Sequence, residues 1–131
     1  MIYMFDTNVI GYLVRGSSLA LKRRFESGKY DTYAISAVVY AEILYGLRKI
    51  NENKIALKIK TFLENLRIVE FNTDAAEMYA KIRADLEKSG TPIDNMDLLI
   101  AASAMAEKAI LVSHNTRHFL KVKDLNLEDW F

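Results

Sequence analysis

The chain opens with the segment Ile2-Tyr3-Met4-Phe5-Asp6-Thr7-Asn8, in which four mostly apolar residues are followed directly by three polar ones. The apolar run has the length of a short buried strand. Asp6, Thr7 and Asn8 are typical of the start of a helix, because their side chains can accept hydrogen bonds from free backbone N–H groups. A buried strand that passes straight into a helix is the repeating unit of a parallel α/β sheet.

The same alternation recurs along the chain. Short apolar runs predict further strands at residues 32–35, 67–71, 109–112 and 125–127. Helical periodicity predicts helices at residues 19–26, 37–49, 54–65 and 95–108, a short helix from the capping segment 6–8 to about residue 14, and a long helix from its cap at Thr73 to about residue 88. Ser36 and Thr73 are the expected N-caps of two of these helices, and a polar loop is expected at 51–53. We therefore expect one domain, residues 1–131, of the α/β class, a three-layer fold whose central parallel sheet of four to five strands is flanked by helices.

The composition limits the class of protein. The 131 residues are 51% hydrophobic, and the net charge is +1, from 18 basic and 17 acidic residues. The absence of cysteine excludes disulfides, thiolate metal sites and cysteine nucleophiles. No apolar run approaches the ~18 residues of a membrane span, and the N-terminus lacks the pattern of a signal peptide. We expect a soluble, cytoplasmic protein that does not enter a membrane.

Polar residues directly follow several of the predicted strands. Asp6 follows the first strand, Ser36 the second, and Ser113-His114-Asn115 the strand at 109–112. Asp97 lies in the first turn of the helix that leads to that last strand. Open parallel sheets bind ligands beyond the carboxyl ends of their strands, so these residues are expected near one binding edge.

Two carboxylates stand in apolar helical segments. Glu42 lies within residues 38–45 and Asp97 within residues 96–102. A buried carboxylate is costly unless it is paired or bound to a metal, which favours a functional role for both. Each also has a structural interpretation: Asp97 as a partner of the helix dipole, and Glu42 as a residue that faces solvent or a lysine.

Other polar residues around these acids have two interpretations as well. Asp6 is also a good helix cap, and Thr7 is an orienting or capping residue rather than a ligand. Asp94 either shares a helical face with Asp97, as an auxiliary acid, or caps that helix. Ser36 is expected, with Thr7 and Asp94, to play an auxiliary part in the site.

Asp6, Glu42 and Asp97 together predict a metal site. Clustered carboxylates repel one another, and some would hold protons at neutral pH unless a divalent cation neutralised them. All-oxygen ligands suit Mg²⁺ or Mn²⁺ better than zinc. A metal that lowers the pKa of a bound water and stabilises a leaving oxygen is suited to phosphodiester hydrolysis.

With these residues in view, the sequence resembles the PIN-domain nucleases, and more closely the VapC toxins of bacterial toxin–antitoxin pairs. The matching stretches run in the family's order along essentially the whole chain: residues 4–8, 36, 40–46, 90–93, 97–102, 112–119 and 127–130. Any one of these stretches is weak evidence, but the whole set in this order is specific for the family.

The resemblance implies a PIN fold and an Mg²⁺- or Mn²⁺-dependent endoribonuclease in which Asp6, Glu42 and Asp97 hold the metal. The fourth family position, acidic or asparagine, falls on Asn115, which would be a neutral ligand or water-positioning group. Asp94 stands where these toxins often have glycine. The family's substrates are structured RNAs, often tRNA, and their cleavage inhibits translation. The resemblance further implies a homodimer and a VapB-type antitoxin whose C-terminal segment fills the active-site groove.

Basic residues along the chain are candidates for contacts with RNA phosphates. Arg117 is favoured, because it lies two residues from Asn115. Arg15 and Arg48 are further candidates, and an ordinary solvated surface is the alternative for each of the three.

Other functions fit only part of the pattern. A signalling receiver domain needs an acidic pair after the first strand and a lysine after a late strand, and a phosphatase with an aspartyl nucleophile needs Asp-x-Asp where this chain has Asp-Thr-Asn at residues 6–8. His114 and His118 are candidates for metal-free acid–base catalysis, but this leaves the carboxylates unexplained. A PIN-like module that binds RNA without cleaving it stays open.

Overall fold

The computed structural model describes residues 1–51 and 53–131. Glu52, in the predicted polar loop at 51–53, lies outside the described residues. The strands are β1 (Ile2–Phe5), β2 (Thr32–Ser36), β3 (Arg67–Val69), β4 (Ile110–Val112) and β5 (Leu127–Glu128). The helices are α1 (Thr7–Arg15), α2 (Leu19–Ser27), α3 (Ala37–Lys49), α4 (Lys54–Leu63), α5 (Thr73–Lys88), α6 (Asn95–Ala106) and α7 (Thr116–Phe119).

The strands form one parallel sheet in the order β3-β2-β1-β4-β5. In this sheet β1 is central, with Met4 opposite Ala34 of β2 and Leu111 of β4. The chain moves outward from β1 to β3 and then crosses back through α5 and α6 to β4. The strand order therefore reverses between β1 and β4, and such a switch point is where open parallel sheets bind ligands. The predicted fold class, a parallel sheet of four to five strands flanked by helices, is confirmed.

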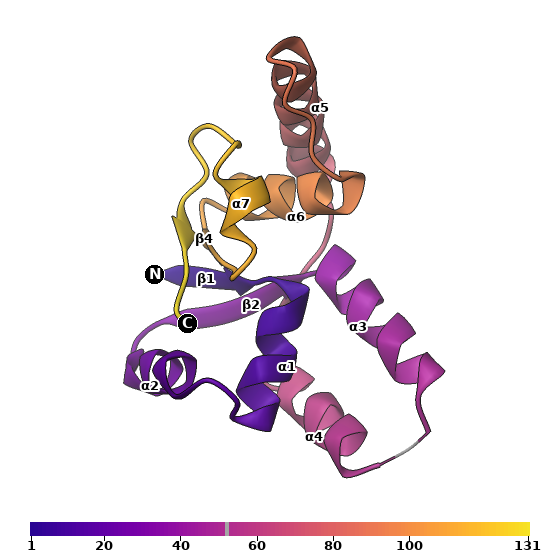
Figure 1. The fold of residues 1–131 in the computed structure, drawn as a ribbon, viewed down its shortest axis with the longest axis vertical. Helices are drawn as coiled ribbons and strands as arrows, with labels where there is room; N and C mark the ends of the chain where they lie inside the picture. The colour runs from indigo at the N-terminus through magenta and orange to yellow at the C-terminus, as the bar shows by residue number, and fades with distance from the viewer. Residues whose placement is uncertain (52) are drawn as a thin grey trace.

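Helices lie on both sides of the sheet. Figure 1 shows α1 to α4 on one side of the central strands and α5, α6 and α7 on the other. The apolar runs of the sequence are buried between them, and Phe5 at the end of β1 is fully buried. Its ring stacks on Tyr33 of β2, with centroids 5.5 Å apart, and meets Trp130 edge-on at 5.7 Å. Trp130 thus ties the C-terminal tail onto the central strands, next to the end of β1.

Side-chain caps begin the two helices that carry Glu42 and Asp97. The hydroxyl of Ser36, which is buried, accepts a hydrogen bond from the backbone N of Val39 at 3.1 Å and starts α3. The carboxylate of Asp94, which is exposed, accepts one from the backbone N of Met96 at 3.2 Å and starts α6. A cap of this kind contributes about 1 kcal/mol to stability. Of the two interpretations of Asp94, the structure supports the helix cap.

Some local details differ from the sequence predictions. The cap of α5 is Asn72 rather than Thr73: the side-chain oxygen of Asn72 accepts from the backbone N of Ala75 at 3.0 Å, and Thr73 is already in the helix. The strand expected at 67–71 ends at residue 69, and the one expected at 125–127 lies at 127–128. The sequence did not predict α7, whose four residues are too few to show helical periodicity.

In residues 1–51 and 53–131, no helix is both long and apolar enough to cross a membrane.

Candidate active site

Asp6 stands at the carboxyl end of the central strand and is only 8% exposed. One oxygen of its carboxylate accepts a hydrogen bond from the backbone N of Thr7 at 2.9 Å, so Asp6 caps α1. The other oxygen accepts from the hydroxyl of Ser113, the residue that follows β4, at 2.8 Å. Asp6 is therefore both a helix cap and a buried acid at the switch point between β1 and β4.

Glu42 reaches the same place from α3, where its side chain is half-buried. The hydroxyl of Thr7 donates a hydrogen bond to the Glu42 carboxylate at 2.7 Å. Thr7 thus contacts Asp6 through its backbone and Glu42 through its side chain. These two contacts place Thr7 between the two acids, and its orienting role stays a prediction.

Asp97 lies in the first turn of α6 and contacts a histidine that sequence reasoning did not connect with it. Nδ1 of His118, on α7, lies 2.9 Å from the Asp97 carboxylate. A protonated Nδ1 that donates to the carboxylate accounts for this distance. The side-chain amide nitrogen of Asn115 lies 3.4 Å from the same ring atom. Asp97 and His118 are 21 residues apart, on either side of β4. The packing of α7 on α6 brings them together, and the sequence carries no local signal for this contact.

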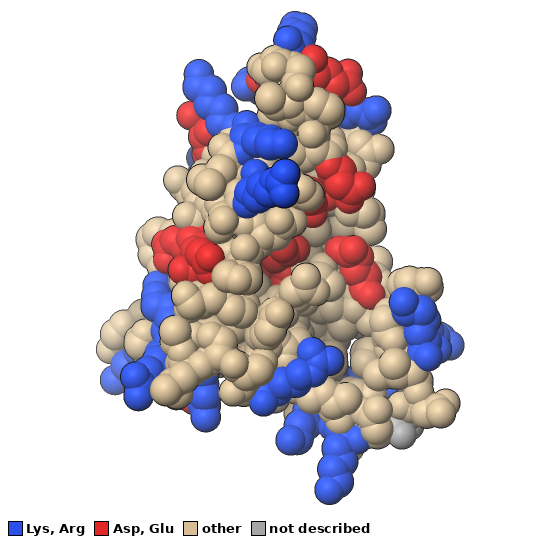
Figure 2. Space-filling model, viewed as in Figure 1, with Lys and Arg blue, Asp and Glu red and all other residues tan. Residues whose placement is uncertain are grey.

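The acidic side chains of the site are not balanced by nearby lysine or arginine side chains. The pKa of Asp6 is raised above its usual range, chiefly because burial removes the carboxylate from water. The hydrogen bonds from Ser113 and Thr7 lower this pKa, whereas the nearby charges of Asp97 and Glu42 raise it further. Among the described residues, no lysine or arginine forms an ion pair with Asp6 or Glu42. Figure 2 shows a band of acidic side chains across the middle of one face, with basic side chains above and below it.

The donor atoms of this site suit a hard divalent cation, because all of them are carboxylate, hydroxyl or amide oxygens. Their present positions do not form a finished metal site: in the part of the chain that the structure describes, no three acidic, histidine or cysteine side chains are close enough to hold an ion. The Thr7 hydroxyl holds the Glu42 carboxylate, and His118 holds that of Asp97.

The remaining predicted residues lie at different places. Asn115 is exposed at the start of α7, and its side chain makes no cap hydrogen bond. Arg117 is exposed on α7, and Arg48 is exposed near the end of α3. Arg15 lines a groove of about 410 Å³ that also has Thr7 and Glu42 in its wall and runs between α1, α3 and α4. Of the three arginines, Arg15 thus shares a groove with a predicted site acid.

Two further features bear on the sequence predictions. The Ser113 hydroxyl makes two hydrogen bonds. It donates to Asp6, and its oxygen accepts from the backbone N of Asn115 at 2.9 Å, so Ser113 links β4, Asp6 and the start of α7. His114 contacts Asp129 at 3.1 Å and stacks on Phe131 at 4.5 Å. His114 and His118 therefore have separate partners, which does not support a paired-histidine mechanism.

The comparison with known families agrees with this geometry. The PIN-domain model matches residues 3–125, nearly the whole chain. The chain belongs to the PIN-domain family. Within that family it is similar to VapC proteins: Ribonuclease VapC2 of Rickettsia felis is 38% identical over 132 residues, which cover 99% of this chain and 98% of that protein. The tRNA(fMet)-specific endonuclease VapC of Shigella flexneri is 31% identical over 130 residues, which cover 98% and 97%.

A solved structure supports the same assignment. The crystal structure of VapBC2 from Rickettsia felis, bound to a DNA fragment from its promoter, contains a chain that superposes with a TM-score of 0.91 at 37% identity. The match covers 100% of both chains. The predicted relationship to the PIN-domain and VapC proteins is therefore confirmed.

The buried charge of Asp6 leads to a prediction about stability. In EDTA, Asp6→Asn should unfold at higher urea than the wild type near neutral pH. The folded chain binds the Asp6 proton more tightly than the unfolded chain, so the cost of the charge is absent below the unfolded pKa of about 3.9 and is complete above the raised folded pKa. The advantage of the variant should therefore grow as the pH rises.

Urea denaturation between about pH 3 and pH 8 measures this difference. Asp74→Asn is the control, because Asp74 is an exposed acid in the first turn of α5. If the stability of Asp6→Asn relative to the wild type does not rise with pH, the ionised Asp6 carboxylate does not destabilise the folded chain, and the prediction is wrong.

Proposed function

We propose that this PIN-domain chain is the ribonuclease toxin of a type II toxin–antitoxin pair and hydrolyses phosphodiester bonds in RNA with a bound Mg²⁺ or Mn²⁺. The observation that carries the proposal is the buried Asp6 carboxylate, with its pKa raised by burial and by the charges of Asp97 and Glu42 and with no basic side chain paired to it. The charges of Asp97 and Glu42 act on Asp6, and among the described residues no lysine or arginine pairs with Asp6 or Glu42, so the site is suited to a divalent cation.

In this proposal Asp6, Glu42 and Asp97 hold the metal, which would activate a water and stabilise the leaving oxygen when bound. The protein's part is to position the three carboxylates. The Ser113 hydroxyl and the backbone N of Thr7 each hold one oxygen of the Asp6 carboxylate, at 2.8 and 2.9 Å, and so fix its orientation. His118 contacts Asp97 and Thr7 contacts Glu42, so each positions one of the carboxylates that would hold the metal.

Asn115 is the neutral fourth member of the proposed site. Its side-chain amide lies 3.4 Å from the His118 ring, which itself contacts Asp97, so Asn115 is at the edge of the carboxylate group. An amide at this place can orient a water or a phosphate oxygen without adding negative charge. This suits a site whose acids already repel one another.

The proposed substrate is RNA, and specifically tRNA. The relative from Shigella flexneri is named a tRNA(fMet)-specific endonuclease, which supports this class of substrate. Arg15, in the groove beside Glu42, and the exposed Arg117 and Arg48 are the proposed contacts with phosphates. Cleavage of tRNA would inhibit translation and would place the protein's action in the cytoplasm.

The proposed partner is a VapB-type antitoxin, and the proposed assembly contains a homodimer of this chain. VapBC complexes among the solved structures support an antitoxin partner, since one of them superposes on the full chain. The groove of about 410 Å³ beside Glu42 has an apolar wall from α1, α3 and α4 with Arg15 at its rim, which suits a peptide that carries both apolar and acidic side chains. A segment bound there would cover the acids.

The metal site is tested by replacing each acid with its amide. Asp6→Asn, Glu42→Gln and Asp97→Asn should each lower Mn²⁺-dependent cleavage of bulk tRNA by at least about 100-fold, because each removes a charged ligand worth several kcal/mol in the transition state. EDTA should abolish cleavage by the wild type. Asp74→Asn is the matched control for Asp97→Asn, because both acids lie in the first turn of a helix.

Circular dichroism shows whether each variant is folded. In addition, saturating Mn²⁺ should raise the melting temperature of the wild type and leave that of Asp97→Asn nearly unchanged. Full activity in two of the three variants, or cleavage that persists in EDTA, would reject the shared metal site.

Toxicity is tested in cells. Induced expression of the wild-type chain alone should arrest growth, Asp97→Asn should not, and co-expression of the small protein encoded directly upstream should restore growth. Growth is followed by optical density, with immunoblots to show equal amounts of each variant. Harmless expression of the wild type would reject the toxin assignment and leave the nuclease assignment standing.

A further inference from the structure

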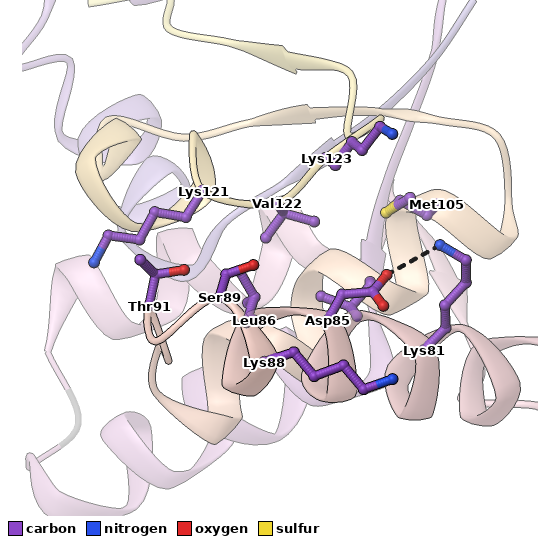
Figure 3. Close-up of a pocket in the computed structure, with 11 residues that line it drawn as sticks. Lys81, Asp85, Leu86, Lys88, Ser89, Thr91, Met105, Lys121, Val122 and Lys123 are labelled. Carbon is purple, nitrogen blue, oxygen red and sulfur yellow. Dashed lines mark hydrogen bonds and ion pairs between the residues drawn. The ribbon is translucent and has the colours of Figure 1, made fainter.

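A second pocket lies on the side of the molecule formed by α5 and the turn after α7. Its volume is about 420 Å³. The floor is apolar and includes Leu86 and Val122, which are 6% and 5% exposed. The rim carries four lysines, two from α5 and two from the turn: Lys81, Lys88, Lys121 and Lys123. Figure 3 shows these lysines arranged around the pocket, with Lys121 beside Thr91 at one end.

The charge of this rim is nearly uncompensated. Asp85 is the one acid in the lining, and its carboxylate is paired with Lys81 at 3.2 Å, drawn as a dashed line in Figure 3. Lys88, Lys121 and Lys123 form no ion pair with any residue in the described ranges. The four lysines and one aspartate therefore give the pocket a net charge of +3. The hydroxyls of Ser89 and Thr91 add further hydrogen-bond donors.

Both walls of the pocket continue directly into the candidate active site. Lys121 is three residues after His118, whose ring contacts Asp97. Thr91 is three residues before Asp94, the cap of the helix that carries Asp97. Three residues of chain span at most about 11 Å, so the backbone of Lys121 lies within about 11 Å of that of His118, and Thr91 lies equally near Asp94. One RNA molecule can therefore reach both places.

We propose that this lysine pocket binds backbone phosphates of the RNA that extends beyond the cleavage site, an inference that rests on the proposed ribonuclease function. Lysine is a flexible point charge, and ammonium groups spread around a wide rim suit several phosphates of one polyanion. A single small anion would instead require donors that converge on one point, such as an arginine or backbone N–H groups. The pocket adds affinity for the substrate and takes no part in the chemistry.

The test compares two triple variants of the full chain with the same change in net charge. Lys88→Gln, Lys121→Gln and Lys123→Gln are combined in the pocket variant. The control combines Lys29→Gln, Lys54→Gln and Lys58→Gln, three lysines that follow α2 or lie on α4, at the opposite end of the molecule (Figure 1). Binding of fluorescently labelled bulk bacterial tRNA is measured by anisotropy in EDTA, so that no cleavage occurs, over a series of salt concentrations.

The pocket variant should lower the slope of log binding constant against log salt by about 2, since each lost lysine–phosphate contact contributes roughly 0.7 to 0.9. Its Kd at ~0.1 M salt should rise about tenfold to hundredfold on the same basis. The control should keep nearly the wild-type slope. Replacing the three pocket lysines by arginine should retain binding, because the positive charge is kept. Circular dichroism confirms that each variant is folded.

Equal salt slopes for the pocket variant and the control would overturn the lysine site. A parallel assay of tRNA cleavage by the wild type with Mn²⁺ separates this result from failure of the proposed function. Cleavage by the wild type together with unaltered binding by the pocket variant rejects the lysine site alone. Absence of cleavage together with binding that depends on the pocket lysines rejects the ribonuclease and supports the RNA site.

Discussion

The burial of one carboxylate, Asp6, is the constraint around which this molecule is organised. A nearly buried acid must have hydrogen-bond donors, and Asp6 has two, the backbone N of Thr7 and the hydroxyl of Ser113. Ser113 is in place only because β4 pairs with β1 in the register that sets Phe5 opposite Val112. A shift of one residue in that register would turn the Ser113 side chain to the other face of the sheet. The central strand pair and the site are thus one structural unit.

Glu42 and Asp97 are held in place by hydrogen bonds to other side chains rather than by direct contact with Asp6. Thr7 bonds Glu42 at 2.7 Å and His118 lies 2.9 Å from Asp97, so each acid has a neutral or weakly basic partner. Burial, with a smaller contribution from the charges of Asp97 and Glu42, raises the pKa of Asp6, and the ionised carboxylate therefore opposes folding near neutral pH. Proteins keep such unfavourable groups together at functional sites, and a divalent cation would turn the repulsion into a binding energy.

Much of the architecture could be predicted from the sequence, because it depends on local signals. The strand Ile2–Phe5 and the helix Ala37–Lys49 were predicted with their actual bounds, since an apolar run and a serine cap mark each clearly. The short helix α7 and the contact of His118 with Asp97 could not be predicted, because they depend on tertiary packing. Neighbouring polar residues such as Asn72 and Thr73 offer equal capping signals, and only the backbone conformation decides between them. The PIN-domain assignment is established, while the roles of the individual site residues stay predictions.

Crystals soaked in MnCl₂ provide the most direct test of the central claim, that the acids around Asp6 form one divalent-metal site. Anomalous scattering locates manganese independently of any assay of activity. The account predicts a strong anomalous peak at about 2.1 Å from carboxylate oxygens of Asp6 and Asp97, with the Asp97 side chain turned away from His118. Peaks only at other carboxylates, with Asp97 still paired to His118 at saturating Mn²⁺, would contradict it.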